Sequence, residues 1–195
     1  ASFAQQRLVD FVNPFIGTGG HGHTYPGATM PFGMVQLSPD NGRNGWDWTS
    51  GYHYSDSIIQ GFSHTHLSGT GIGDLCDISV MPMVDVSASS AKIISKFSHK
   101  QESAKPGYYA VQLKNFDIWA ELTTTIRCGF HRYTFPESKK SIIRFDLGFA
   151  INWDEATETN FKQINDTTFI GYRFSKGWAQ NQKIFFLSEH VYEFK

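Results

Sequence analysis

Two histidine pairs, each with one residue between its members, could bind a metal or a substrate. His21 and His23 lie in GTGGHGHTYPG, and His64 and His66 lie in GFSHTHLSGTGIGD. In an extended chain, residues i and i+2 point to the same side, so each pair offers two imidazoles to Zn or Cu. Such a site would be completed by His53, Asp74 or Asp77. We favour the interpretation that these imidazoles hydrogen-bond glycine-rich loops or contact a ligand without metal, because His-x-His alone lacks the spacing of recognised metal motifs.

Aromatic side chains suggest a second kind of binding site. Trp46 and Trp48 lie in the loop sequence NGWDWTSGYHY, and the nearby tyrosines are Tyr25, Tyr52 and Tyr54. Aromatic rings stack on the apolar faces of sugars while neutral polar groups bond the hydroxyls. The stretch 11–39 contains no Asp, Glu, Lys or Arg. These loops are therefore expected to face a neutral ligand, such as a carbohydrate.

The carboxylates do not form an evident catalytic pair. Hydrolysis of a glycoside needs two carboxylates about 5–10 Å apart, and the pairs that the sequence offers are Asp74 with Asp77 and Asp154 with Glu155. We predict a loop-capping role for Asp74 and solvated positions for Asp154 and Glu155. The sequence also contains no GxSxG motif, which would mark a nucleophilic serine. These loops therefore read as a recognition surface without a catalytic pair.

The glycines of the third cluster are interpreted as points of close approach. Gly69, Gly71 and Gly73 alternate along SGTGIGD, but a dinucleotide-binding fingerprint requires a strand before it and a helix after it. Neither is visible in the sequence. Glycine here is expected to let the backbone approach a ligand or another domain closely.

Composition restricts the class of protein. The 195 residues fit one domain, and a net charge of −1 argues against nucleic acid as a partner. No apolar run approaches the roughly 20 residues needed for a membrane span. Cys76 and Cys128 are expected to remain unpaired, since buried free cysteine commonly behaves as a small apolar residue. Residues 1–10 are interpreted as a disordered segment or the remnant of a secretory signal cleaved after Ala4.

The elements that must position the three clusters are strands. Up to Gly73 the chain holds 13 of its 18 glycines, so this half is expected to be loops with strands only at 32–37 and 58–63. Short apolar runs follow, and they predict strands at 77–84, 92–98, 107–114, 116–126, 130–135, 141–147, 168–174 and 183–188. No segment predicts a helix of ten or more residues. The fold class is therefore all-β, an antiparallel β-sandwich with long glycine-rich loops, with Trp119, Trp153 and Trp178 predicted in its core.

Long stretches of the chain resemble the N-terminal domain of glycoside hydrolase family 92, the calcium-dependent exo-α-mannosidases. The matching stretches are VNPFIGTGGHGHTYPGATMPFGMVQLSPD (12–40), GYHYSDSIIQGFSHTHLSGTGIGD (51–74), KPGYYAVQL (105–113), AELTTTIRCGFHRYTFP (120–136) and GYRFSKGWA (171–179). They occur in the family's order and cover almost the whole chain. The final VYEFK departs from the family pattern.

The resemblance implies a supersandwich-like domain at 11–195, incomplete at its end, that packs on a C-terminal (α/α)6 catalytic domain of the same polypeptide. The catalytic acid, the catalytic base and the Ca2+ site would belong to that second domain, so no catalytic, metal or cofactor site is expected in this chain. A mannose-containing glycan would bind between the domains of a secreted or periplasmic enzyme of N-glycan degradation, exo-acting and α-1,2-specific. The cleft would include His21, His23, Trp46, Trp48, His64, His66 and Gly69.

Two other functions remain open. A freestanding carbohydrate-binding module would share the sandwich and the exposed aromatic residues. A small metal-binding protein would instead use the His-x-His pairs.

Overall fold

The computed structural model describes residues 7–42, 45–86, 93–138 and 140–191. Its regular elements are antiparallel strands and three short 3-10 helices, which confirms the prediction of an all-β sandwich. The helices are η1 (Leu8–Phe11), η2 (Trp46–Trp48) and η3 (His99–Gln101). Within the described residues, no helix is long and apolar enough to cross a membrane. The predicted cleavage site at Ala4 and the final segment 192–195 lie outside the described residues.

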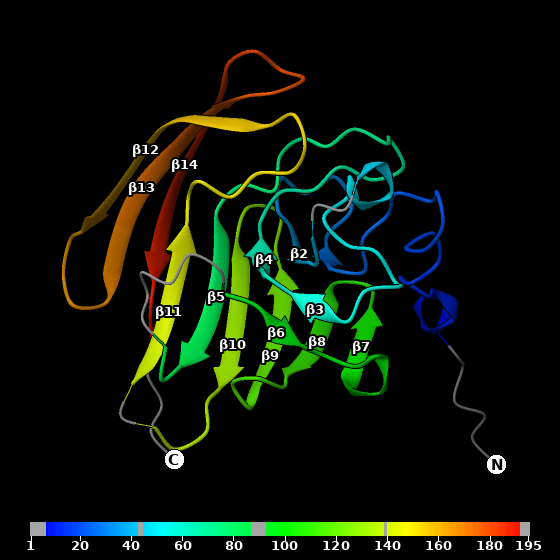
Figure 1. The fold of residues 1–195 in the computed structure, drawn as a ribbon, viewed down its shortest axis with the longest axis horizontal. Coiled ribbons are helices and arrows are strands. Elements are labelled where there is room, and N and C mark those ends of the chain that lie inside the picture. Colours follow the sequence, from blue (N-terminus) through cyan, green and yellow to red (C-terminus); the bar gives the residue numbers. More distant parts are fainter. Residues whose placement is uncertain (1–6, 43–44, 87–92, 139, 192–195) are drawn as a thin grey trace.

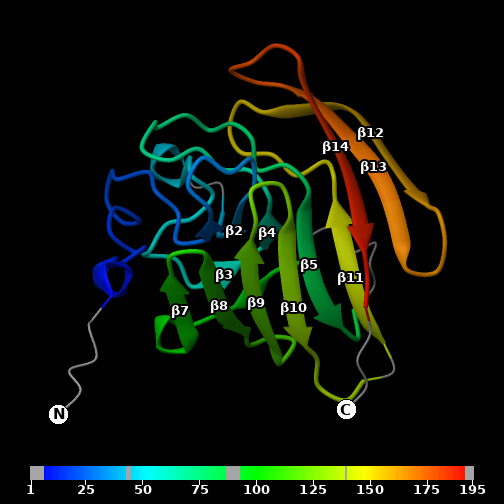
Figure 2. The same cartoon turned by 180° about the vertical axis from the view of Figure 1, so that it is seen from behind.

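Two antiparallel sheets face each other (Figures 1 and 2). The first has the order β1 (Ala28–Thr29), β2 (Gln36–Asp40), β4 (Gly61–Ser63), β5 (Ser79–Val84) and β11 (Ser141–Asp146). The second has the order β10 (Gly129–Thr134), β9 (Ile118–Thr124), β8 (Tyr108–Leu113) and β7 (Glu102–Lys105). A small pair, β3 (Ile58–Ile59) with β6 (Ser95–Lys96), lies beside them.

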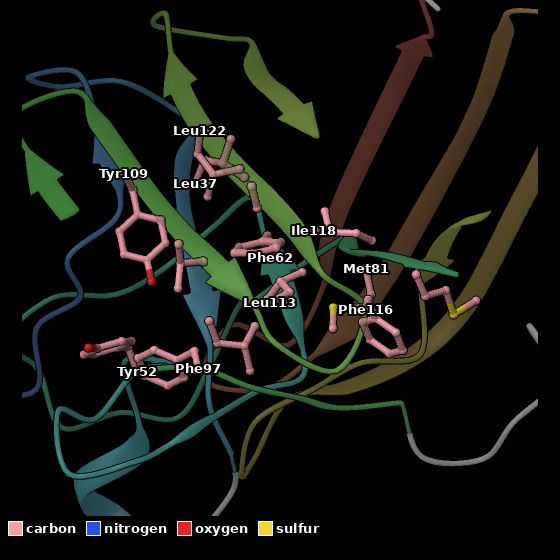
Figure 3. Packing of buried hydrophobic residues seen from close by; sticks show 14 of the residues in the cluster. Leu37, Tyr52, Phe62, Met81, Phe97, Tyr109, Leu113, Phe116, Ile118 and Leu122 are labelled. Carbon is pink, nitrogen blue, oxygen red and sulfur yellow. The ribbon is translucent and has the colours of Figure 1, made fainter. Parts of the chain in front are cut away.

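The core lies between these two sheets and arises from alternation along the strands. In β9, Ile118, Ala120 and Leu122 are buried, whereas Trp119 and Glu121 between them are only partly buried. This pattern matches the predicted inward face. The other strands add side chains to the same core cluster, among them Leu37 of β2, Phe62 of β4, Met81 of β5 and Leu113 of β8 (Figure 3). The sandwich gives the glycine-rich loops a rigid base.

A third sheet consists of β12 (Glu155–Gln163), β13 (Thr168–Lys176) and β14 (Gln182–Glu189). The sequence predicts β13 and β14 but not β12, because every residue of EATETNFKQ except Ala156 is exposed and no apolar alternation marks the strand. The short strands β1 and β7 are missed for a similar reason. They are two and four residues long and too short for a periodic signal.

The predicted strand at 32–37 is wrong in its position. Phe32 has a φ of +59°, and the amide of Gly33 closes a turn on the carbonyl of Met30 at 2.9 Å, so the strand begins only at Gln36. The predicted strand at 58–63 is divided between β3 and β4, which belong to different sheets.

The core prediction fails for two tryptophans. Trp153 is 63% exposed and Trp178 is 64% exposed, because they lie in the connections before β12 and between β13 and β14 rather than in strands. Trp119 is partly buried. The two cysteines are both free, as predicted, with Cys76 buried and Cys128 exposed.

Candidate functional site

The three loop clusters that carry the candidate residues meet at one end of the sandwich. In Figure 1 this is the upper end, where η2 and the connection that follows β4 lie side by side. Hydrogen bonds join the third cluster to the other two there. The amide of Gly69 donates to the carbonyl of His23 at 2.6 Å, and the indole of Trp46 donates to the carbonyl of Gly71 at 3.0 Å.

His21, His23, Trp46 and Asp47 form the centre of this end face. The Nδ1 atom of His21 lies 2.6 Å from Oδ1 of Asp47, and Nε2 of His23 lies 3.7 Å from the same oxygen. The hydrogen bond with His21 is the largest influence that lowers the pKa of Asp47, so this carboxylate stays ionised as a hydrogen-bond acceptor. The ring of His23 meets Trp46 edge-on with 4.1 Å between centroids. We call these four residues the end cluster.

Within the end cluster, His23 has an unused polar atom. The residue is 6% exposed, and its Nε2 has no hydrogen-bond partner among the described residues. Its φ of +52° is a left-handed conformation that is uncommon for a residue with a side chain. Buried polar atoms nearly always have a partner. A buried nitrogen without a hydrogen bond, in a residue at positive φ and beside an indole that is 57% exposed, is a feature expected of a site that completes its bonds with a ligand.

Gly71 makes room for the exposed indole. It has a φ of +63°, and a Cβ built on it would lie 2.9 Å from Nε1 of Trp46. Any side chain here would push the indole away from its carbonyl acceptor. Gly69 has a φ of +72° with open space around it. Glycine at these two positions therefore has a local reason, a positive φ at both and the adjacent indole at Gly71. The expected approach to a ligand or another domain stays a prediction.

Trp48 and His53 hold the loops together rather than face solvent. The two rings stack with centroids 4.4 Å apart, and the indole of Trp48 donates to Oδ2 of Asp56 at 2.5 Å. Nε2 of His53 lies 3.2 Å from the carbonyl oxygen of Gly20. These contacts tie the first cluster to the second.

His64 and His66 lie beneath the end face, on the first sheet. Nδ1 of His64 lies 2.7 Å from the carbonyl oxygen of Ile78, and its Nε2 lies 3.0 Å from Nε2 of His131. Burial is the largest of the influences that lower the pKa values of His64 and His131. The side chain of His66 is 0% exposed and contacts Asp40. The two His-x-His pairs therefore lie at different depths. His21 of the first pair is at the surface, whereas the second pair lies beneath the end face.

Two further exposed tryptophans border the same connection. The amide of Trp153 donates to the carbonyl of Gly73 at 3.2 Å, and the amide of Trp178 donates to Oδ2 of Asp74 at 3.0 Å. Asp74 also accepts from the Gln182 side chain at 3.0 Å, which agrees with the loop-capping role predicted for it. An open, largely apolar pocket beside Trp178 is lined by Leu67, Asp74, Leu75, Trp178, Ala179 and Gln182. The sequence shows these indoles, but not that their connections reach the glycine-rich loop.

Two of the proposed catalytic carboxylates instead form a buried ion-pair network. Arg173 of β13 is 0% exposed and contacts both Asp77 and Asp154. It also donates to the carbonyls of Leu147 and Phe149, at 3.1 Å each. The prediction of a solvated Asp154 is therefore wrong, because the arginine compensates for its burial, whereas Glu155 is exposed as expected. A lone Arg in a strand sequence gave no signal of this role.

The end cluster has the groups for binding a neutral polar ligand but only part of those for hydrolysis. Among the described residues, it holds one carboxylate, Asp47, where glycoside hydrolysis needs two. Calcium does not fit either. It takes six to eight oxygen ligands, and the group of metal-type side chains in the described residues, Asp40, His66 and Cys76, supplies a single carboxylate.

Comparison with known families decides the relationship. The model of the glycosyl hydrolase family 92 N-terminal domain matches residues 11–195. The chain belongs to this family. A family GH92 α-mannosidase from Bacteroides thetaiotaomicron, solved in complex with mannoimidazole, is 40% identical over 93% of this chain and 25% of its own, with a TM-score of 0.88. The GH92 family glycosyl hydrolase ccman5 is 28% identical over 91% of this chain and 25% of its own, with a TM-score of 0.73.

A further relative is a protein of Arthroderma benhamiae. The uncharacterized secreted glycosidase of Arthroderma benhamiae is 31% identical over 174 residues, which cover 77% of this chain and 22% of that protein. This GH92 chain thus spans about a quarter of the length of the relatives that it matches.

Proposed function

We propose that this domain is the sugar-binding half of a secreted or periplasmic α-mannosidase, exo-acting and of the α-1,2 type, whose catalytic residues and Ca2+ site lie in a further domain. Membership of GH92 and 40% identity to an α-mannosidase that binds mannoimidazole support the substrate class. A relative named as secreted supports the compartment. The end cluster is the observation on which the proposal mainly rests.

Each group of the end cluster has a role in this proposal. The exposed face of Trp46 stacks on the apolar face of the terminal mannose, and the free Nε2 of His23 completes its bonding with a sugar hydroxyl. Ionised Asp47 accepts from a second hydroxyl, and exposed His21 keeps that carboxylate oriented. Neutral hydroxyls satisfy these groups without the cost of desolvating a second charge.

The other predicted cleft residues fit supporting roles in this proposal. Gly69 lets the backbone approach the sugar or the neighbouring domain, whereas Trp48, His64 and His66 hold the loops on the sandwich. Trp153 and Trp178, which are exposed and border the glycine-rich connection after β4, extend the surface that the catalytic domain covers or that a longer glycan reaches. Exposed aromatic groups of this kind mark interaction sites.

Kinetics of the complete enzyme test the proposal. Trp46→Ala removes the stacking surface, worth about 0.5–1.5 kcal/mol beyond area burial, so kcat/KM on an aryl α-mannoside is expected to fall by roughly 2–12-fold or more. Phe185→Ala is the matched control, since Phe185 is 69% exposed but lies on β14. The 195-residue chain alone is expected to show no turnover with added calcium. An equal effect of both substitutions, or turnover by the chain alone, would contradict the proposal.

A carbohydrate-binding module without a catalytic partner is the second candidate. The three exposed tryptophans around one glycine-rich connection favour it. Calorimetry of the chain with mannobiose separates the two, because a half-site is expected to bind weakly or not at all, whereas a complete module would bind measurably.

A further inference from the structure

Asp40, His66 and Cys76 converge in the interior of the domain, at the first sheet. Their ligand-type atoms, one from each side chain, all lie within 4.8 Å of one another, and all three residues are buried. Asp40 ends β2, His66 follows β4, and Cys76 precedes β5. The cluster therefore links the end of β2 to the connection between β4 and β5, in the sheet that carries the end face.

The imidazole of His66 is oriented as a metal ligand. Its Nδ1 lies 2.8 Å from the carbonyl oxygen of Gln36, and a carbonyl only accepts, so Nδ1 carries the hydrogen. In the neutral ring Nε2 then presents a lone pair, and this atom lies 3.0 Å from Oδ1 of Asp40. Two acceptors facing each other at this distance need a cation between them, either a proton or a metal ion. Metal-bound histidines typically donate their other nitrogen to a carbonyl in this way.

The backbone supports the same convergence. Cys76 has a φ of +58°, and its neighbour Leu75 has a φ of +67°, conformations that cost energy for residues with side chains. Opposite them, a Cβ on Gly51 would lie 2.5 Å from Oδ1 of Asp40 and 3.0 Å from the ring of His66. Glycine is thus required for the carboxylate and the imidazole to occupy these positions.

Charge also favours a divalent cation. Among the described residues, His66 is the basic side chain that pairs with Asp40, and the carboxylate is 0% exposed. A divalent ion with one carboxylate and one thiolate gives a neutral site, which is the cheapest arrangement for buried charges. The thiol proton would leave to solvent as the sulfur binds. Sulfur, nitrogen and oxygen together suit zinc.

We propose that Asp40, His66 and Cys76 bind a structural Zn2+ ion, with the Ser63 hydroxyl or a water as fourth ligand. The Ser63 Oγ lies 3.1 Å from Nε2 of His66. Tetrahedral zinc places its ligand atoms about 3.3–3.7 Å apart, so the three groups need to shift by about 1 Å or less. The ion fastens the connection at 64–78 to the sheet. This inference departs from the expectation that the chain binds no metal, and it does not depend on the proposed sugar site.

Metal analysis of the purified protein tests whether Asp40, His66 and Cys76 bind zinc. After incubation with zinc and dialysis, the unmodified protein and Cys128→Ser are expected to retain about one more zinc per chain than Cys76→Ser. Cobalt in place of zinc is expected to give a thiolate-to-metal charge-transfer absorption that disappears in Cys76→Ser and persists in Cys128→Ser. Cys128 is the matched control because it is the exposed free cysteine.

Two outcomes would overturn the proposal. One is less than about a tenth of an equivalent of zinc in the unmodified protein, which would leave an imidazolium and carboxylate pair as the explanation. The other is bound zinc without the thiolate absorption of the cobalt form, which would place the ion at surface histidines. If Cys76→Ser does not fold, the cobalt spectrum of the unmodified protein alone decides.

Discussion

Replacement of Arg173 by methionine is expected to destabilise the domain by about 3–5 kcal/mol, the range for a buried ion pair that loses one partner. Arg173 is fully buried. Its guanidinium contacts Asp77 and Asp154 and donates to two backbone carbonyls. Methionine fills similar space but leaves two buried carboxylates without a countercharge.

The expected destabilisation by Arg173→Met is large relative to the free energy of unfolding of the whole domain. A domain of this size has a free energy of unfolding of about 5–15 kcal/mol, and 1 kcal/mol corresponds to about 2–4 °C in melting temperature. The variant is therefore expected to melt about 6–20 °C lower. Burial already raises the pKa of Asp154, and Arg173 opposes that rise. Without Arg173 the carboxyl takes up a proton more easily, so the deficit is expected to shrink as the pH falls.

Denaturant and thermal unfolding, followed by circular dichroism at two pH values, measure this effect. Lys176→Met is the control, since the Lys176 and Glu155 side chains of its ion pair are 53% and 68% exposed. Such pairs contribute less than about 1 kcal/mol. If Arg173→Met stays within about 1 kcal/mol of the unmodified protein at neutral pH, the reasoning about this network is refuted.

Two further predictions concern the end face and the buried histidines. Gly71→Ala is expected to displace the Trp46 indole and lower kcat/KM, whereas Gly107→Ala, also at positive φ but with open space around it and between β7 and β8, is expected to leave kcat/KM unchanged; equal kinetics would contradict this. Burial, followed by the neighbouring His64, lowers the pKa of His131 well below its usual value. The unfolded state therefore takes up a proton on His131 at a higher pH than the folded state does. The stability that neutral His131 preserves is fully present above about pH 6.5, and below that pH the free energy of unfolding falls by up to about 1.4 kcal/mol per pH unit. His131→Gln should flatten this dependence in unfolding experiments, and an unchanged slope would contradict it.

The sequence predicted the sandwich well where one face of a strand is buried. In β9, Ile118, Ala120 and Leu122 alternate with less buried neighbours, and these three apolar residues are the buried ones. The prediction from sequence missed β12, because almost all of its side chains are exposed and no apolar residues alternate along it. The beginning of β2 was misplaced because the turn at Phe32 depends on a positive φ that no sequence rule assigns to phenylalanine.

The candidate site was predicted in part. The convergence of three loop clusters was implied by the resemblance to glycoside hydrolase family 92, and His21, His23 and Trp46 do come together. Asp47 was missed although it lies between Trp46 and Trp48, because a single carboxylate in a loop is usually solvated. The arrangement of Asp40, His66 and Cys76 could not be found either. It depends on the pairing of strands distant in sequence, which spacing along the chain does not encode.

A crystal structure of the complete polypeptide with mannoimidazole would show whether the end cluster binds sugar. If it does, the sugar ring lies within about 4.5 Å of the Trp46 indole, and Nε2 of His23 or a carboxylate oxygen of Asp47 lies about 2.7–3.2 Å from a hydroxyl. A ligand bound in the enzyme without contact to any of these three residues would contradict sugar binding by the end cluster.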